Sequence, residues 1–160
     1  MKKRYLFIMV GCPGSGKSYF LQNNELTKNS IIVSRDKVRF SIISDEDEYF
    51  AKEKQVFAEF INQIQKGLDS GKNVYADATH LTGVSRYKLM NALNLNNVGI
   101  IPIYLDTPLE VCLERNKMRT GRARVPESAL KNMYFSLTDP ANDEKNMDFK
   151  YDDILYVDYK

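Results

Sequence analysis

An eight-residue segment near the start of the chain has the residue types and spacing of a phosphate-binding loop. It reads Gly-Cys-Pro-Gly-Ser-Gly-Lys-Ser over residues 11–18 and matches the pattern G-x-x-x-x-G-K-[ST] at every position. Glycines let backbone N–H groups curl around an anion, Lys17 adds a positive charge for the β- and γ-phosphates, and the Ser18 hydroxyl can ligate Mg²⁺. We therefore predict that the phosphates of a nucleotide bind to Gly11, Pro13, Gly14, Ser15, Gly16, Lys17 and Ser18.

A second candidate group follows the short apolar run Ile31–Val33. The carboxylate of Asp36 can accept the proton of an attacking hydroxyl, as the general base of phosphoryl transfer does. It can equally be the N-cap of a helix predicted over Lys37–Ile43, and position alone does not separate the two roles. Arg39, one turn further on the same face, could hold a phosphate of the acceptor or be a solvated helix charge.

A third candidate group follows the run Val74–Ala76. Asp77 at its end can organise Mg²⁺ or its waters, bind an acceptor group, or make a structural hydrogen bond. His80 is the single histidine of the chain. It could contact a substrate, although a lone histidine is more often a structural residue.

A basic stretch lies between residues 115 and 126. It holds Arg115, Lys117, Arg119, Arg122 and Arg124, which are five cations within ten residues. The stretch is interrupted by Thr-Gly at 120–121 and stops at a proline, so it predicts a loop between two helices. Such a loop suits a lid whose arginines neutralise charge on a transferred phosphoryl group. A loop that is basic only for solubility is the alternative.

The elements that must position these residues are predicted from five apolar, β-rich runs. The runs are continuous rather than alternating, which indicates parallel strands covered on both faces. Helical patterns separate them, so we predict an α/β fold whose ligands bind beyond the carboxyl ends of the strands. The runs are Tyr5–Val10, Ile31–Val33, Val74–Ala76, Val98–Leu105 and Ile154–Val157.

The clearest helical pattern runs from Asp47 to Ser70, and Gly71 follows where a helix needs a left-handed residue to stop. A second helix is predicted to begin with a capping box at Thr107-Pro108-Leu109-Glu110. The apolar face of the first helix is predicted to hold Phe50, Phe57, Ile61, Ile64 and Leu68.

Length and charge exclude several classes of protein. A chain of 160 residues predicts a single domain over residues 1–160, and 23 Lys+Arg against 21 Asp+Glu exclude a strongly basic nucleic-acid coat. Cys12 and Cys112 are too few for a disulfide framework, which favours a reducing cytoplasm. The start, Met1-Lys2-Lys3-Arg4 before six apolar residues, imitates a signal peptide but is shorter than the roughly 7–15 such a segment needs. We expect a cytoplasmic protein with no membrane partner.

The chain resembles the kinase domain of bacteriophage polynucleotide kinase and its bacterial relatives, within the small P-loop kinases. This resemblance implies a P-loop NTPase fold with three α/β/α layers, a five-stranded parallel sheet in the order 2-3-1-4-5, and a basic lid at about 115–126. It is carried by residues 11–18, Ser34-Arg35-Asp36 with Arg39, Asp77-Ala78-Thr79, Arg115-Asn116 with the basic stretch to Arg124, and Val125-Pro126 with Met133-Tyr134.

The same resemblance implies transfer of the ATP γ-phosphate to the 5′-hydroxyl of DNA or RNA. Lys17 and Ser18 would hold ATP and Mg²⁺, and Asp36 would be the general base. The acceptor would be bound by Arg35, Arg39, Asp77 and Thr79, and the ATP phosphates would be reached by Arg115 and by Arg119 or Arg122. His80 stands where these relatives commonly have Asn. No D-x-D-G-T phosphatase signature is present.

Two other functions remain open at this stage. The first is a P-loop kinase of a small metabolite, an antibiotic or a nucleotide. The second is a non-catalytic ATP-binding module that acts with a repair partner. A GTP switch is disfavoured because the sequence has no [NT]-K-x-D guanine motif.

Overall fold

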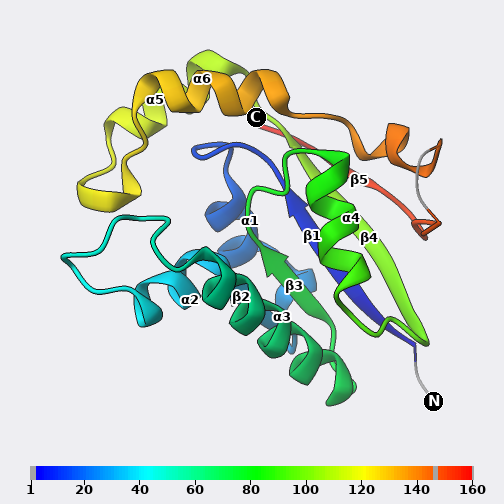
Figure 1. Cartoon of the computed structure of the whole chain (residues 1–160). Helices are drawn as coiled ribbons and strands as arrows, with labels where there is room; N and C mark the ends of the chain where they lie inside the picture. The colour runs from blue at the N-terminus through cyan, green and yellow to red at the C-terminus, as the bar shows by residue number, and fades with distance from the viewer. Residues whose placement is uncertain (1–2, 146–147, 160) are drawn as a thin grey trace.

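Five short strands form one parallel sheet in the computed structural model, which describes residues 3–145 and 148–159. The order across the sheet is β2-β3-β1-β4-β5, as the family resemblance implied. Figure 1 shows the strands running through the middle of the molecule. They are β1 (Arg4–Val10), β2 (Ile31–Ser34), β3 (Val74–Asp77), β4 (Val98–Asp106) and β5 (Leu155–Asp158).

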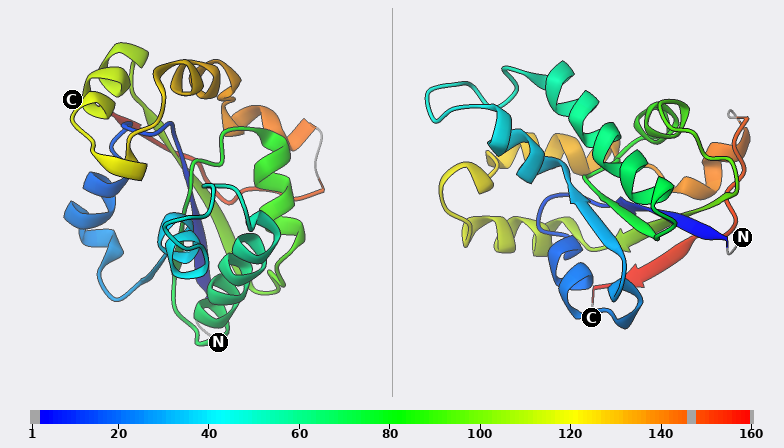
Figure 2. Two further views of the ribbon diagram at one scale, coloured as in Figure 1. Left: turned by 60° about the vertical axis from the view of Figure 1, so that its left-hand side comes forward. Right: turned by 90° about the horizontal axis from the view of Figure 1, so that it is seen from below.

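Helices cover both faces of the sheet, which confirms the predicted three layers. In the view from below (Figure 2, right), α2, α3 and α4 lie on one side of the sheet and α1 on the other. Among the described residues, no helix is both long and apolar enough to cross a membrane. The helices are α1 (Lys17–Asn23), α2 (Arg35–Ile42), α3 (Glu53–Asp69), α4 (Gly83–Asn91), α5 (Leu109–Lys117) and α6 (Glu127–Ser136), with 3-10 turns η1 (Glu25–Thr27), η2 (Gly121–Ala123) and η3 (Pro140–Lys145).

The first strand lies at the centre of the sheet and is buried on both faces. Leu6 is paired with Val74 of β3 and with Ile100 of β4, so β1 has hydrogen-bonding neighbours on both sides. Leu6 packs into the core beneath α3 and α4, whereas Phe7 packs into the core with Leu21 of α1. This two-sided burial explains why the strand is a continuous apolar run in the sequence.

The loops after β1, β2, β3 and β4 all leave the carboxyl edge of the sheet. Helices α5 and α6 and the segment between them lie over this edge (Figure 1). The parallel direction of the strands therefore gathers the predicted phosphate-binding loop, both candidate acidic residues and the basic stretch at one end of the molecule.

The predicted helix over residues 47–70 begins six residues later than expected, at Glu53, and ends before Gly71 as predicted. The segment before it forms turns, in which the Asp47 carboxylate accepts a hydrogen bond from the Ser44 N–H at 2.9 Å. Phe50, expected on the buried face, is 64% exposed. Local and tertiary hydrogen bonds hold this segment outside a helix, and hydrophobic periodicity does not register them.

One of the two roles left open for Asp36 is excluded, and one predicted helix cap is wrong. Ser34, and not Asp36, is the N-cap of α2, because its side chain accepts the hydrogen bond of the Lys37 N–H. Thr107 does not cap α5, since its hydroxyl donates to the Ser15 carbonyl at 2.7 Å. In the first case the result is a carboxylate left available in the first helical turn. In the second case the result is a hydrogen bond that joins the end of β4 to the phosphate-binding loop.

Helix α3 packs against the sheet through a glycine. A Cβ added at Gly67 would meet Val74 Cγ2 at 2.7 Å and Ile31 Cδ1 at 3.2 Å.

We predict that Gly67→Ala destabilises the fold by about 1–3 kcal/mol through overpacking, although alanine is the better helix former. Chemical denaturation measures the change. Lys66→Ala, on the exposed side of the same helix, is the matched control, and equal stability of the two variants would contradict this prediction.

Candidate active site

The predicted phosphate-binding loop has the backbone conformation that its sequence requires. Gly14 and Gly16 have φ values of 82° and 105°, which side chains rarely adopt. The Nζ of Lys17 donates to the carbonyls of Gly11 and Cys12, each at 2.8 Å, and so closes the loop on itself. The first turn of α1 follows directly at Lys17, and no side chain caps it, so the N–H groups at the start of this helix are next to the loop.

Helix α5 and the residues that lead into it contact this loop. Arg115 Nη1 donates to the Gly14 carbonyl at 3.1 Å, and the Thr107 hydroxyl holds the Ser15 carbonyl. A Cβ at Gly14 would lie 2.7 Å from the Cys112 carbonyl, so the loop and the helix are in close contact. The loop is thus preorganised by the element that leads into the basic stretch.

Lys17 is the main positive charge at the loop. Burial lowers the pKa of Lys17 to about 8, and the nearby Asp77 carboxylate opposes this shift. Burial in turn raises the pKa of Asp77, with Lys17 opposing. Each group is therefore less readily charged than in water, and an anion placed beside Lys17 would favour its charged form.

The second wall of the site is a hydrogen-bonded cluster around Asp36. Its Oδ1 accepts from Arg39 Nη1 at 2.8 Å and from the Tyr49 hydroxyl at 2.6 Å. Within the described residues no hydrogen bond reaches Oδ2, and the side chain is 63% exposed. Asp36 lines the cavity, and its carboxylate is oriented through one oxygen while the other has no partner among these residues, which is the arrangement that a general base needs.

Arg39 is buried rather than solvated, which corrects one of the two sequence-based interpretations. Its side chain is 4% exposed, and Nε and Nη2 both donate to Glu53 Oε1, at 3.0 and 2.6 Å. The guanidinium also lies 4.2 Å from the centre of the Tyr49 ring. Carboxylates on both sides offset the cost of burying this charge.

Tyr49 and Glu53 are the site residues that the sequence analysis missed. They are four residues apart, and both contact the guanidinium of Arg39. The helix predicted over residues 47–70 included both residues and therefore gave no reason to single them out. Glu53 also accepts from Arg35 Nη2 at 3.0 Å. The spacing of a tyrosine and a glutamate just before an apolar helix was the available signal, and it is a weak one.

The segment after β3 joins the two walls. The backbone carbonyl of Thr79 accepts from the Gly11 N–H at 3.0 Å. Asp77 is paired in register with Ser34 at the end of β2. Through these contacts the segment that holds Asp77 and Thr79 connects the phosphate-binding loop to the strand that precedes the Asp36 cluster.

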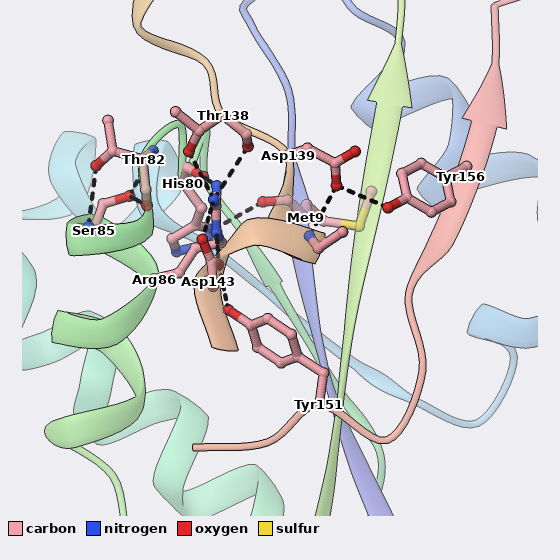
Figure 3. Close-up of polar contacts among 11 residues, drawn as sticks. Met9, His80, Thr82, Ser85, Arg86, Thr138, Asp139, Asp143, Tyr151 and Tyr156 are labelled. Carbon is pink, nitrogen blue, oxygen red and sulfur yellow. Dashed lines mark hydrogen bonds and ion pairs between the residues drawn. The ribbon is translucent and has the colours of Figure 1, made fainter. Parts of the chain in front are cut away.

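His80 follows with an unusual backbone conformation, at φ 42°. Asn and His are among the few side chains that adopt this region readily, so a histidine is compatible with this backbone conformation. Nδ1 lies 2.9 Å from the Met9 carbonyl, and Arg86 holds the His80 carbonyl at 2.8 Å (Figure 3). Burial, chiefly, lowers the pKa of His80 to about 4, and the positive charges of Arg35, Arg86 and Lys17 act in the same direction.

The basic stretch also lines the cavity. Arg119 is close enough for its charge to lower the pKa of Lys17. Arg122 instead donates through Nη2 to the carbonyls of Asp45 and Asp47, at 2.7 and 2.8 Å. The structure therefore brings Arg115 and Arg119 toward the phosphate-binding loop, and Arg122 to the loop after α2.

One cavity of about 1590 Å³ joins all these groups. The predicted residues Pro13, Gly14, Ser15, Gly16, Ser18 and Thr79 line it together with the charged residues of both walls and four arginines of the basic stretch, whereas Gly11 is buried. A cavity with a phosphate-binding loop at one end and an oriented carboxylate at the other can place a nucleotide phosphate beside a second substrate.

The parallel sheet, its strand order and the loop after β1 define the class of P-loop kinase folds. A family model described as an AAA domain matches residues 6–140, and the chain belongs to that family. The resemblance to polynucleotide kinase domains is confirmed by the relatives. A protein of Acanthamoeba polyphaga mimivirus, whose name describes a bifunctional polynucleotide phosphatase/kinase, is 27% identical to this chain. The match covers 74% of this chain and 24% of the viral protein.

Two further similarities extend this comparison. An L-seryl-tRNA(Sec) kinase of Methanococcus maripaludis is 30% identical over 84% of this chain and 53% of its own length. A solved structure of the Pnkp1/Rnl/Hen1 RNA repair complex is similar at a TM-score of 0.74 and 27% identity, over 94% of this chain and 48% of that one. The chain thus spans about half or less of each of these proteins.

Nucleotide binding is predicted to be accompanied by proton uptake at Lys17. Nucleotide phosphates favour the charged amine, so a pKa of about 8 in the free protein rises on binding. At pH 8 we expect uptake of up to about half a proton per nucleotide, and close to none at pH 6.5. Calorimetric titrations in buffers of different ionisation enthalpy measure this number. Equal uptake at both pH values would contradict the prediction.

His80 is predicted to make folding stability depend on pH. Its pKa falls from about 6.5 in the unfolded chain to about 4 in the folded protein, so the unfolded state binds more protons between these values. Stability is therefore lost as pH falls from 6.5 to 4, by about 3 kcal/mol relative to the non-titrating variant His80→Asn. Denaturation curves at several pH values test this. The prediction would be disproved if the free energies of unfolding of the wild type and His80→Asn changed equally with pH.

Proposed function

We propose that residues 1–160 form one kinase domain, acting in the cytoplasm, that transfers the γ-phosphate of ATP to the 5′-hydroxyl end of DNA or RNA. The observation that carries this proposal is the oriented Asp36 carboxylate, which shares one cavity with the Lys17-Ser18 end of the phosphate-binding loop. The polynucleotide kinase named among the relatives and the RNA repair complex support the choice of acceptor.

The nucleotide side of the reaction uses the loop and α5. Backbone N–H groups of residues 11–18 and the Lys17 amine would bind the β- and γ-phosphates, with Arg115 holding the loop. Ser18 and Asp77 fit Mg²⁺, since hydroxyl and carboxylate oxygens are the ligands it prefers and both residues line the cavity. When bound, Mg²⁺ would supply positive charge to the phosphates.

The acceptor side uses the Asp36 cluster. Oδ2 of Asp36 would take the proton of the 5′-hydroxyl as its oxygen attacks the γ-phosphorus, and ADP leaves. Arg39 would contact the adjacent phosphate of the strand, and Arg35, Asp77 and Thr79 would line the acceptor pocket. Of the lid arginines, Arg119 would stabilise charge on the transferred group, because its charge already acts on Lys17. Arg122 would hold the lid closed.

Asp36→Asn tests the base. The variant keeps the hydrogen-bonding oxygen but cannot accept the proton, so we expect the transfer rate to fall by about 100-fold or more. The affinity for ATP should remain unchanged, because the residue lies on the acceptor wall. Label transfer from γ-labelled ATP to a 5′-hydroxyl oligonucleotide measures the rate. Asp69→Asn, an exposed substitution of the same kind at the far end of α3, is the control, and equal activity of the two variants would refute the assignment.

A second candidate function is phosphorylation of a small hydroxyl compound. One observation favours it: the bonds of Arg39 to Asp36, Tyr49 and Glu53 occupy Nε, Nη1 and one N–H of Nη2. A guanidinium has five N–H donors, so among the described residues only one donor of Arg39 is left for an acceptor phosphate. A small hydroxyl compound without such a phosphate would not need Arg39 as a contact.

Nucleoside acceptors separate these two functions. If Arg39 contacts the strand, a nucleoside 3′-monophosphate should be phosphorylated about 10-fold or more better than the free nucleoside, because a charge-assisted hydrogen bond is gained. Steady-state rates with the two acceptors measure the ratio. Equal rates on both, together with faster transfer to a small alcohol that no oligonucleotide inhibits, would select the second function.

A further inference from the structure

His80 uses only half of its hydrogen-bonding capacity within the described residues. The side chain is 5% exposed, and its Nδ1 lies 2.9 Å from the Met9 carbonyl. A carbonyl oxygen can only accept, so Nδ1 carries the proton and Nε2 holds a lone pair. Nε2 is buried and meets no hydrogen-bond donor in the part of the chain that the structure describes.

The position of this lone pair is fixed before any substrate binds. Arg86, itself fully buried, donates to the His80 carbonyl at 2.8 Å and is held by two hydrogen bonds to Asp143, at 2.6 and 2.9 Å (Figure 3). The Thr138 N–H donates to the Leu81 carbonyl at 2.9 Å. The segment after β3 is therefore held by the chain that follows α6, and the imidazole has little freedom to turn.

The imidazole belongs to the acceptor side of the cavity. His80 lines the same cavity as Arg35, Asp36 and Thr79, and its ring packs 6.1 Å from the Phe60 ring. Burial, chiefly, lowers the pKa of His80 and keeps the ring neutral, so its lone pair remains available at neutral pH. Buried polar atoms in folded proteins nearly always have a partner, and each exception calls for an explanation.

We propose that Nε2 of His80 accepts a hydrogen bond from an O–H or N–H group of the terminal nucleoside on the phosphate-accepting strand. His80 is then a specificity-determining residue for that strand, an inference that rests on the proposed polynucleotide kinase function. Two sources of the donor share this chemistry: the ribose 2′-hydroxyl, which distinguishes RNA from DNA, and an amino or imino group of the base.

His80→Asn is the variant that isolates this bond. Asparagine adopts a φ of 42° readily, and its amide can still donate to the Met9 carbonyl, but it has no acceptor atom at the place of Nε2. Tyr151→Phe is the matched control. It removes the 2.6 Å hydrogen bond to Asp143, and thus perturbs the same buried cluster at a residue that does not line the cavity.

Steady-state kinetics with γ-labelled ATP and 5′-hydroxyl oligonucleotides give the first readout. We expect His80→Asn to lower kcat/KM for the oligonucleotide by about 10-fold or more, with the KM for ATP unchanged. Tyr151→Phe should leave both values close to those of the wild type. A merely structural role would instead lower activity toward both substrates in both variants.

The oligonucleotides identify the donor. One pair differs only by the terminal 2′-hydroxyl, and a second pair carries terminal adenine or unsubstituted purine. The wild type should discriminate within one pair by about 10-fold. His80→Asn should lose that discrimination, because removing Nε2 and removing the donor of the strand break the same hydrogen bond. Discrimination within the first pair identifies the ribose 2′-hydroxyl as the donor. Discrimination within the second pair identifies the base as the donor.

Nitrogen NMR gives a readout that does not depend on activity. The chain has one histidine, so the imidazole spectrum of labelled protein needs no assignment by mutation. The Nε2 resonance should shift when oligonucleotide is added and stay in place when ATP alone is added.

Three results would overturn the inference. An unshifted Nε2 resonance would show that the strand does not bind to the lone pair. Unchanged kinetics of His80→Asn would remove its role in specificity while leaving the proposed function intact. Failure of the wild type to phosphorylate any oligonucleotide would remove the proposed function and this inference with it.

Discussion

The parallel register of the central strands is the constraint on which the site depends. Because β1 pairs with β3 on one side and with β4 on the other, the loops that follow these strands leave the same edge of the sheet. A single backbone hydrogen bond, from the Gly11 N–H to the Thr79 carbonyl, then joins the phosphate-binding loop to the acceptor side. An antiparallel neighbour on either side would place one of these loops at the opposite end of the molecule.

Two buried arginines organise the parts of the site that lie outside the phosphate-binding loop. Arg39 is held by Asp36 and Glu53, and Arg86 by Asp143. Burying a guanidinium is costly unless its donors are satisfied, so each arginine holds the surrounding chain in one arrangement. In the first case the arrangement orients a carboxylate that lines the cavity. In the second it holds the backbone of the segment that carries His80.

Much of the fold could be predicted from the sequence because its signals are local. The strand β1 and the loop after it are a continuous apolar run followed by an unbroken motif, and both were predicted correctly. The start of α3 was not, because turn hydrogen bonds such as that from the Ser44 N–H to Asp47 hold the chain just before it. The role of Thr107 was also misjudged, since its hydroxyl donates to the distant Ser15 carbonyl.

The sequence by itself determined the fold class, the phosphate-binding loop, the placement of Asp36 and Asp77 at strand ends, and the basic stretch over 115–126. These follow from periodicity and from spacing along a few residues. Only the tertiary structure decided that Arg39 is buried, that Arg122 reaches the loop after α2, and that Asp143 holds Arg86 from 57 residues further along the chain. Such contacts depend on which segments the sheet brings together, and short-range pattern in a single sequence carries no record of that pairing.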